Sequence, residues 1–255
     1  MPAISVSIVS HAQGQLLLPL LADLDRHFTT YPLEVLLTLN LPEEIPFDTD
    51  SFRFPVIVHV NTVPAGFSEN HDHAFARSSG QYFCVMNPDV RLNEDPFPAL
   101  VSCLQDTAVG VVAPVVLNAA GEIEDSARFF PTPLKIVCKA LGGCRGSDYV
   151  VKDKIVLPDW VAGMFMLFRR ETFEELGGFD QRYFLYYEDV DLCARLRLQS
   201  YEVALCPDAR VIHYAHRSSH RDLRYMAWHL SSMLQFFFSV PFLKICWMRC
   251  TRRFS

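Results

Sequence analysis

The sequence lacks the short motifs that usually mark a nucleotide or metal site. It has no GxGxxG or P-loop segment, so an ordinary dinucleotide or ATP site is not expected. Its eight cysteines include no CxxC pair and no even spacing, which argues against a zinc site or a disulfide framework. Because Cys84, Cys193 and Cys206 lie inside apolar segments, we expect reduced cysteines in a cytoplasmic protein.

An excess of positive charge is also missing. The 255 residues carry a net charge of −6, so bulk electrostatics give no reason to expect nucleic acid as a partner. The N-terminal segment MPAISVSIVSH has no basic region ahead of an apolar stretch, and no export signal is expected. Hydrophobic residues make up 50% of the chain and charged residues 20%, which supports a core and excludes a disordered chain.

What the chain does have is an alternation of strand-like and helix-like segments. Helical periodicity marks Gln15–His27, where Pro19 favours a late start, and Glu69–Ser78. Apolar runs around these helices predict strands, and such alternation favours a mostly parallel α/β sheet. The predicted strands are Ile4–Ser10, Leu33–Leu39, Val56–Val60, Tyr82–Met86 and Gly110–Val116.

Polar residues follow several of these strands, and ligands collect at the carboxyl ends of parallel strands. Asn70 and His71 lie just inside the predicted helix Glu69–Ser78. The N-terminus of this helix suits a pyrophosphate because free N–H groups and the helix dipole favour anions. On the alternative interpretation, Asn70 caps the helix while His71 and His73 lie on the surface. The strand ends are Ser10-His11, Asn40 and Asn87–Asp89.

The densest acidic cluster lies near residue 190. Val161–Phe168 predicts one buried strand, Arg170–Leu176 a short helix ended by Gly177-Gly178, and a further helix runs from Val190. Acids at a helix N-terminus complement its dipole, which is the structural explanation. Three acids in four positions nevertheless raise one another's pKa, which is typical of a catalytic or metal site. The three are Glu188, Asp189 and Asp191.

Two blocks of this sequence resemble the signature blocks of family 2 glycosyltransferases. WVAG…RRETFEELGGFDQRYFLYYEDVDLCARLR is similar to the second block of the bacterial rhamnosyltransferase-like branch, and GFSENHDHAF…GQYFCVMNPDV is similar to the first. The resemblance implies a GT-A fold in residues 1–220, a mostly parallel Rossmann-like sheet flanked by helices. Residues 1–117 would form the nucleotide-sugar-binding half and residues 118–220 the acceptor and catalytic half.

The resemblance also implies an activity. A sugar, with rhamnose from dTDP-rhamnose as the best guess, would pass with inversion from a nucleotide-sugar to a hydroxyl of a cell-surface glycan or lipid-linked precursor. Asp189 would be the general base, with Glu188 as the alternate. Trp160 and Gly163 would line the acceptor pocket, and Asp191 would lie beside them, orienting the helix start or an arginine.

On the donor side the resemblance implies a divalent cation, Mg²⁺ or Mn²⁺. Asp89 would contact the metal–diphosphate unit, His213 would be a second ligand, and Asn87 would lie nearby, with Ser10, Asn40 and Asn70 as further donor contacts. Two departures weaken this set: Asn87 replaces the first carboxylate of the usual Asp-x-Asp, and Asn40 stands where many relatives carry an aspartate. Otherwise Asp89 is a turn former and His213 a packed residue. His216 and His220 are weaker candidates.

Two segments are left over. Gly121–Asp148 is long and irregular, and is equally an acceptor-side flap or a mobile insertion. In the tail, residues 221–255, the stretch Tyr225–Leu243 contains no Asp, Glu, Lys or Arg, and Pro241 breaks it. We expect an amphipathic helix on the inner face of the cell membrane first, a packed helix second and a spanning helix third.

Two other functions compete with glycosyl transfer. The asparagines at 40 and 87 fit a non-catalytic nucleotide-binding or scaffold protein with the same fold, whereas the intact acidic cluster speaks against it. A nucleotidyltransferase would share the sheet, but it should carry a Gly-rich N-terminal loop with a basic residue. Ser10–Gln15 (SHAQGQ) has no such basic residue.

Overall fold

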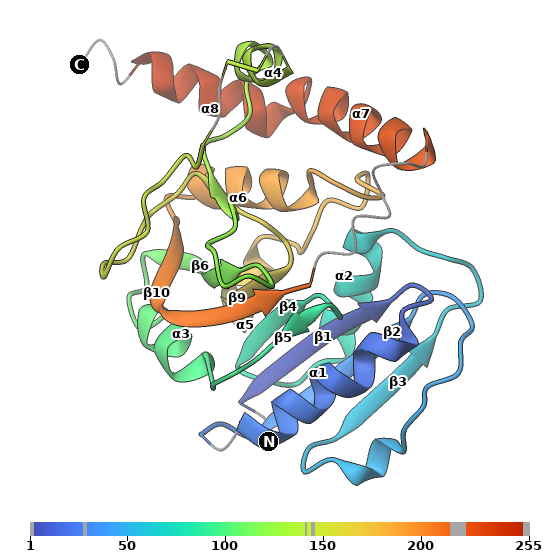
Figure 1. The fold of residues 1–255 in the computed structure, drawn as a ribbon. Coiled ribbons are helices and arrows are strands. Elements are labelled where there is room, and N and C mark those ends of the chain that lie inside the picture. Colours follow the sequence, from blue (N-terminus) through green and yellow to red (C-terminus); the bar gives the residue numbers. More distant parts are fainter. Residues whose placement is uncertain (1–2, 28–29, 141, 144–145, 215–222, 252–255) are drawn as a thin grey trace.

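A single mixed sheet organises the protein (Figure 1). The computed structural model describes residues 3–27, 30–140, 142–143, 146–214 and 223–251. In the described chain the sheet has eight strands in the order β3-β2-β1-β4-β9-β6-β10-β5, and a β7–β8 pair stands apart from it. The strands are β1 Ile4–Ser10, β2 Leu33–Leu39, β3 Val56–Val60, β4 Tyr82–Met86, β5 Val90–Arg91, β6 Val109–Leu117, β7 Ala127–Arg128, β8 Trp160–Val161, β9 Phe165–Arg169 and β10 Glu202–His213.

The first four strands run parallel, as the alternation of helices and strands predicts. β1 pairs in parallel with β2 and β4, and β2 pairs in parallel with β3, whereas β9 enters antiparallel between β4 and β6. The helices are α1 Gly14–His27, α2 Phe67–Arg77, α3 Phe97–Cys103, α4 Pro133–Ala140, α5 Arg170–Glu175, α6 Glu188–Leu198, α7 Leu223–Phe237 and α8 Val240–Thr251, with a short 3-10 turn, η1, at Thr49–Ser51.

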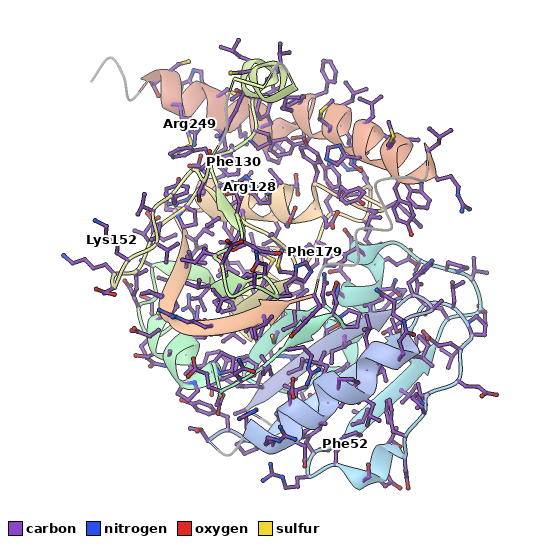
Figure 2. All side chains as sticks on the ribbon, in the orientation of Figure 1. Phe52, Arg128, Phe130, Lys152, Phe179 and Arg249 are labelled. Atoms are coloured by element: carbon purple, nitrogen blue, oxygen red, sulfur yellow. The ribbon has the colours of Figure 1, made fainter. Side chains whose placement is uncertain are left out.

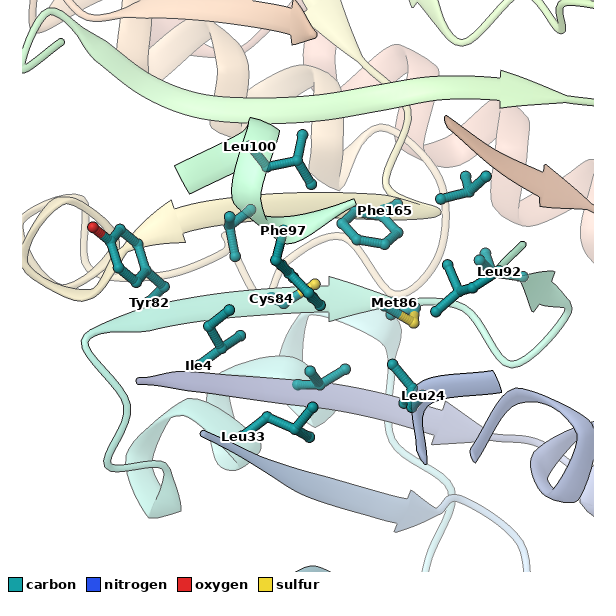
Figure 3. Packing of buried hydrophobic residues seen from close by; sticks show 14 of the residues in the cluster. Ile4, Leu24, Leu33, Tyr82, Cys84, Met86, Leu92, Phe97, Leu100 and Phe165 are labelled. Carbon is teal, nitrogen blue, oxygen red and sulfur yellow. The ribbon is translucent and has the colours of Figure 1, made fainter. Parts of the chain in front are cut away.

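The sheet separates two hydrophobic cores because successive strand side chains point to opposite faces. On β4, Tyr82, Cys84 and Met86 join the core beneath α1 and α3, which Figure 3 shows. Phe83 and Val85 point the other way into the core beneath α5 and α6. The parallel strands β1, β2 and β4 therefore present their carboxyl ends at one edge, between the two layers.

The described structure confirms the α/β class and corrects several local expectations. Val161–Phe168 is two strands, β8 and β9, because the chain turns at Gly163, whose N–H is bound by a side chain of α6. α1 begins at Gly14 with Pro19 inside it, so its start is not late. The segment expected to be irregular contains β7 and α4, and β10 is one long strand interrupted by a bulge.

The cysteines are mostly, but not all, as expected. Cys84, Cys193 and Cys206 are buried thiols, and three more described cysteines are free. Cys138 in α4 instead takes part in a disulfide, so the expectation that every cysteine is reduced is wrong there.

The C-terminal tail packs on the hydrophobic core beneath α5 and α6. Phe236 of α7 and Phe242 and Ile245 of α8 are buried in it, which places both helices beside α6 (Figure 1). Of the described helices, none alone is long and apolar enough to cross a bilayer. Only α7 and α8 taken together reach that length and composition, and they are bent by 52° at the break between them.

Candidate active site

Segments a hundred residues apart meet at the carboxyl edge of the sheet. The N–H of Phe67 at the start of α2 donates to the carbonyl of Phe184 at 2.8 Å, and the Ser68 hydroxyl donates to the carbonyl of Tyr183 at 3.1 Å. Gly66, which caps α2, lies so close that a Cβ there would stand 2.7 Å from the Phe184 carbonyl oxygen. The first block therefore lies directly against the chain that leads into the acidic cluster.

A turn between β8 and β9 links the two acidic corners. The N–H of Asn87, after β4, donates to the carbonyl of Met164 at 2.9 Å. One residue earlier, the N–H of Gly163 donates to Oδ2 of Asp189 at 2.9 Å. Asp89 and Asp189 are thus held on either side of the same short turn, and both side chains are partly exposed.

Asp189 and Glu188 are neighbouring carboxyls whose pKa values are both raised, but their hydrogen-bond partners differ. Burial raises the pKa of both carboxyls, and the neighbouring Asp189 raises that of Glu188 further, well above its ordinary value. Glu188 Oε2 is buried without a hydrogen-bond partner, whereas Asp189 accepts N–H bonds from Gly163 and Val190 and lies near the Arg128 guanidinium. These contacts favour the proton on Glu188 and the negative charge on Asp189, the arrangement that a general base at Asp189 needs.

The backbone before these acids is strained. Tyr186 and Tyr187 have φ values of 69° and 68°, the left-handed region that costs a non-glycine residue about 1–2 kcal/mol. Their rings pack against His229 of α7, with centroids 5.2 and 5.4 Å away. Strain of this kind persists where surrounding packing imposes it, and it sets the direction in which α6 begins.

Asp89 and His213 lie together, as their predicted shared role requires. β5 pairs with the end of β10, so His213 stands opposite Val90, and its Nε2 is 3.3 Å from Asp89 Oδ2. His213 Nδ1 is 3.0 Å from Glu124 Oε2. Burial lowers the pKa of His213, but the carboxylates of Asp89 and Glu124 more than offset this, and the net shift is upward.

These residues fit a divalent cation that shares its coordination with a ligand. Asp89 Oδ1 is buried without a hydrogen-bond partner, and Glu124 fixes the imidazole so that Nε2 faces Asp89, the usual carboxylate–histidine arrangement behind a metal ligand. Among the residues that the structure describes, no three His, Cys, Asp or Glu side chains are grouped so that they could hold an ion alone. Two protein ligands suffice where phosphate oxygens complete the shell.

Three residues predicted to contact the donor form hydrogen bonds to the loops around the site. Asn40 uses its whole amide: Oδ1 accepts from Asn61 Nδ2 and the Ala65 N–H, and Nδ2 bonds the Ala65 carbonyl and His11. Asn70 bonds Asn61 and the carbonyls of Ala65 and Gly66.

Ser10 is equally engaged, because its buried hydroxyl donates to Glu43 at 2.5 Å. Ser10, Asn40 and Asn70 therefore support the strand ends, and contact with the donor stays a prediction for all three. The interpretation of Asn70 as a cap comes closer to what is observed, whereas His71 is buried rather than on the surface.

On the acceptor side the structure separates the predicted residues. Gly163 lies against Asp189. Trp160 lies in β8, and its Nε1 donates to the Phe129 carbonyl at 3.0 Å. Asp191 is fully buried and paired with Arg195 at 2.8 Å, so it cannot reach an acceptor and instead orients that arginine.

No local sequence pattern marks Arg128 and Glu124 as neighbours of the site. Arg128, paired across β7–β8 with Trp160, stacks on that ring at 5.5 Å and lowers the pKa of Asp189. Glu124 orients His213. Both lie in the irregular segment some sixty to ninety residues from their partners, and only strand pairing brings them in. His216 and His220 lie outside the described residues.

Two cavities of about 290 Å³ lie away from these acids. One is lined by residues of β6 and β10 together with Lys152 and Asp153, and the other lies under α8 beside Asp159 and Arg197.

Comparison with known proteins accounts for this arrangement. The family model described as Glycosyltransferase like family 2 matches residues 56–228, which is more than half of the chain and includes both acidic corners. The chain belongs to this family. It is thus a glycosyltransferase of the EC 2.4 class, and its rhamnosyltransferase-like resemblance is confirmed by its relatives.

Two curated rhamnosyltransferases are similar to this chain over most of their length. Rhamnosyltransferase WbbL of Escherichia coli K12 is 29% identical over 185 residues, covering 67% of this family 2 chain and 69% of the relative. The N-acetylglucosaminyl-diphospho-decaprenol L-rhamnosyltransferase of Mycobacterium tuberculosis is 28% identical over 225 residues, covering 76% and 70%.

A solved structure confirms the fold. GalNAc-T7, crystallised with UDP, GalNAc and Mn²⁺, superposes with a TM-score of 0.65 at 17% identity over 84% of this chain. The chain spans only 44% of GalNAc-T7. At this identity the likeness establishes the GT-A fold alone.

Proposed function

We propose that this family 2 enzyme transfers rhamnose, with inversion, from dTDP-rhamnose to a hydroxyl of a lipid-linked glycan precursor. The observation that carries the proposal is the geometry of the two acidic corners: the Gly163 N–H bonds Asp189, and the neighbouring Met164 carbonyl accepts from Asn87, two residues before Asp89. One corner then serves the acceptor and the other the diphosphate. The choice of rhamnose follows the names of both relatives, and the lipid-linked acceptor follows the name of the mycobacterial one.

Asp189 takes the proton of the attacking hydroxyl. Its Oδ2 and Oδ1 are held by the N–H groups of Gly163 and Val190, so the carboxylate keeps one orientation while remaining partly exposed. As the acceptor oxygen attacks the anomeric carbon, the bond to the diphosphate breaks on the opposite side, which inverts that centre. Arg128 favours the charged carboxylate before the proton arrives.

Asp89 and His213 would hold Mg²⁺ or Mn²⁺, which supplies positive charge to the departing diphosphate. Glu124 keeps the imidazole directed at that place, and the unpartnered Asp89 Oδ1 would gain a ligand there. Asn87 contributes its backbone, whose N–H fixes the loop to Met164, and its side chain takes no carboxylate role.

We further propose that the enzyme works at the inner face of the cell membrane through its C-terminal tail. A lipid-linked acceptor has to be met at the membrane surface, and the tail carries six basic and one acidic side chain in an acidic protein.

Replacement of the base tests the proposal. Asp189→Asn should lower the rate of transfer by about 10²–10⁴-fold, the usual contribution of a general base, and leave the Kd for dTDP-rhamnose unchanged. Glu188→Gln is the matched control, because a residue that is already protonated should keep most of its activity as the amide. Transfer and calorimetric donor binding are measured on both; a Glu188→Gln enzyme that is inactive beside an active Asp189→Asn enzyme would reverse the assignment.

Removal of the metal ligand gives a second test. Asp89→Asn should weaken Mn²⁺ binding to the enzyme–dTDP complex at least about tenfold, because a neutral amide replaces one of only two protein ligands. Calorimetric titration of Mn²⁺ into enzyme with dTDP provides the measurement, and Asp95→Asn is a control at a carboxylate outside the site. Equal Mn²⁺ affinity in wild type and Asp89→Asn would exclude this residue as a ligand.

A further inference from the structure

The outer side of α7 is apolar although its inner side already packs on the protein. Leu223, Met226, Leu230 and Leu234 recur at intervals of three or four residues, so they form one stripe along the helix. All four side chains are exposed, while Phe236 on the opposite side is fully buried. A helix that has satisfied its core face and still carries a leucine stripe outward has a second apolar partner.

α8 repeats this arrangement after the bend. Val240, Leu243 and Trp247 lie on one side and are exposed, the last to 69%, whereas Phe242 and Ile245 are buried beneath. An exposed tryptophan at the margin of an apolar face is typical of a membrane–water boundary.

α4 lies at the same end of the molecule as α7 and α8 (Figure 1), far from β1–β3. Its Leu134 is 80% exposed and Val137 is also exposed. The segment that leads into it contacts α8, since the Arg249 guanidinium lies 5.5 Å above the Phe130 ring. Figure 2 shows Arg249, Phe130 and Arg128 in succession from α8 toward the site.

The charge of these helices differs in sign from that of the rest of the protein. α4, α7 and α8 together contain five basic residues and no acidic one, whereas the whole chain carries a net charge of −6. Lys244 is exposed beside Leu243 on the outer side of α8. Lys135 and Arg249 pair with Asp148 and Asp159, so Lys244 is the basic side chain that adds charge to the apolar face. Such a face is complementary to anionic lipid, whereas the same face on a second copy carries charge of the same sign.

We propose that α4, α7 and α8 form one lipid-contacting face that docks on an anionic bilayer surface. The proposal rests on the glycosyltransferase function proposed above and extends it: the acceptor-side segment itself, through α4, is part of the membrane contact. α4 begins five residues after Arg128, so the same short segment reaches from the bilayer to the neighbourhood of Asp189. The helices lie along the interface with their leucine side chains among the lipid headgroups and upper acyl chains.

The test uses the full chain and vesicles of defined composition. Flotation with phosphatidylcholine vesicles should show little binding, and vesicles that also contain phosphatidylglycerol should bind the protein, less so as salt rises. The α4 variant Leu134→Ser/Val137→Ser and the α7 variant Leu230→Ser/Leu234→Ser should each weaken binding at least about tenfold, because each buried aliphatic side chain contributes roughly that factor. The matched control is Ile57→Ser/Val58→Ser, at exposed positions on β3.

Each outcome decides the matter. An α4 variant that floats like the control removes α4 from the face, and wild-type binding by both helix variants overturns the proposal. Lipid-independent association of the wild type, abolished in the same variants in the ultracentrifuge, would assign the face to contacts between copies instead. Transfer to a water-soluble acceptor, measured alongside, separates the two proposals: retained transfer without vesicle binding defeats only the lipid face, and vesicle binding without any transfer defeats only the enzymatic one.

Discussion

At the scale of single residues, the buried polar groups of the site divide into those that react and those that hold. Asp89 and Glu188 each keep a buried oxygen without a hydrogen-bond partner, and such a group costs stability unless a ligand or a proton uses it. Asn40, by contrast, has every hydrogen-bonding group of its amide occupied. Asp191, which is paired with Arg195, also keeps a buried oxygen without a partner, so this feature does not by itself mark the residues proposed to react.

His71 shows a holding role that can be measured through pH. It is buried, its Nδ1 lies 2.7 Å from the Ser7 hydroxyl, and burial lowers its pKa from 6.5 to about 3. The unfolded chain takes up a proton near pH 6.5 and the folded protein does not, so this stability is complete above 6.5 and lost as pH falls toward 3. The loss is at most about 1.4 kcal/mol per pH unit.

His71→Asn should therefore flatten the acid side of the stability profile, whatever it does to stability at neutral pH. Urea unfolding at a series of pH values between those limits measures the slope. His73→Asn, two residues along on the exposed side of α2, should leave the slope as in wild type. Identical slopes in all three proteins would mean that His71 does not titrate as its burial indicates.

At the scale of elements, close contact between backbones decides the geometry of the site. The Phe67 N–H of α2 donates to the Phe184 carbonyl and the Ser68 hydroxyl donates to the Tyr183 carbonyl, and only glycine fits at position 66. A Cβ at Gly66 would lie 2.7 Å from the carbonyl oxygen and 2.9 Å from the Cα of Phe184, which are backbone atoms and cannot rotate away. The spacing between the donor-side helix and the strained turn before Glu188 depends on that contact.

Gly66→Ala should accordingly destabilise the fold by about 1–3 kcal/mol, the usual cost of overpacking, and lower transfer activity by shifting the turn. Gly121→Ala is the control, because a Cβ there meets nothing within 4 Å. The only cost expected is that of an alanine at a φ of +79°, about 1 kcal/mol. Chemical unfolding and transfer rates on both variants give the comparison. Full activity in Gly66→Ala would show that the contact does not position the acids.

At the scale of the whole molecule, the tail is a structural part of the catalytic domain. Phe236 is fully buried, its ring centroid lies 5.7 Å from that of Tyr187 and 5.2 Å from that of Phe242, and the Ser232 hydroxyl donates to the Leu185 carbonyl. The expectation of a packed helix is therefore met on the inner side of α7, whereas contact with lipid on its outer side stays a proposal.

Phe236→Ala should lower the free energy of unfolding by about 3–5 kcal/mol, the typical effect of removing a buried phenylalanine, and reduce activity through the Tyr187 turn. Phe238→Ala provides a matched control two residues away, since that ring is 81% exposed and its loss should change stability by less than about 0.5 kcal/mol. Thermal unfolding measures both. Equal melting temperatures would mean that α7 is not anchored as described.

Much of this architecture could be predicted from local patterns. β1, β2 and β4 begin and end at the residues that apolar runs indicate, because a strand buried on both faces needs a continuous apolar segment whatever surrounds it. The bounds of β3, a more exposed edge strand, also agree with its apolar run. The acidic cluster at Glu188–Asp191 and the aspartate after β4 were visible for the same reason: they lie next to elements that can be recognised from the sequence.

The sequence by itself therefore determined the class of fold, its family and the two acidic corners. Tertiary structure alone decided the surroundings of the polar residues: it buried Asp191 against Arg195, bonded Asn40 to loop backbone, and brought Glu124 to His213 and Arg128 to Asp189. Burial and pairing depend on strands and helices distant in the chain, and no local pattern of residues carries that information.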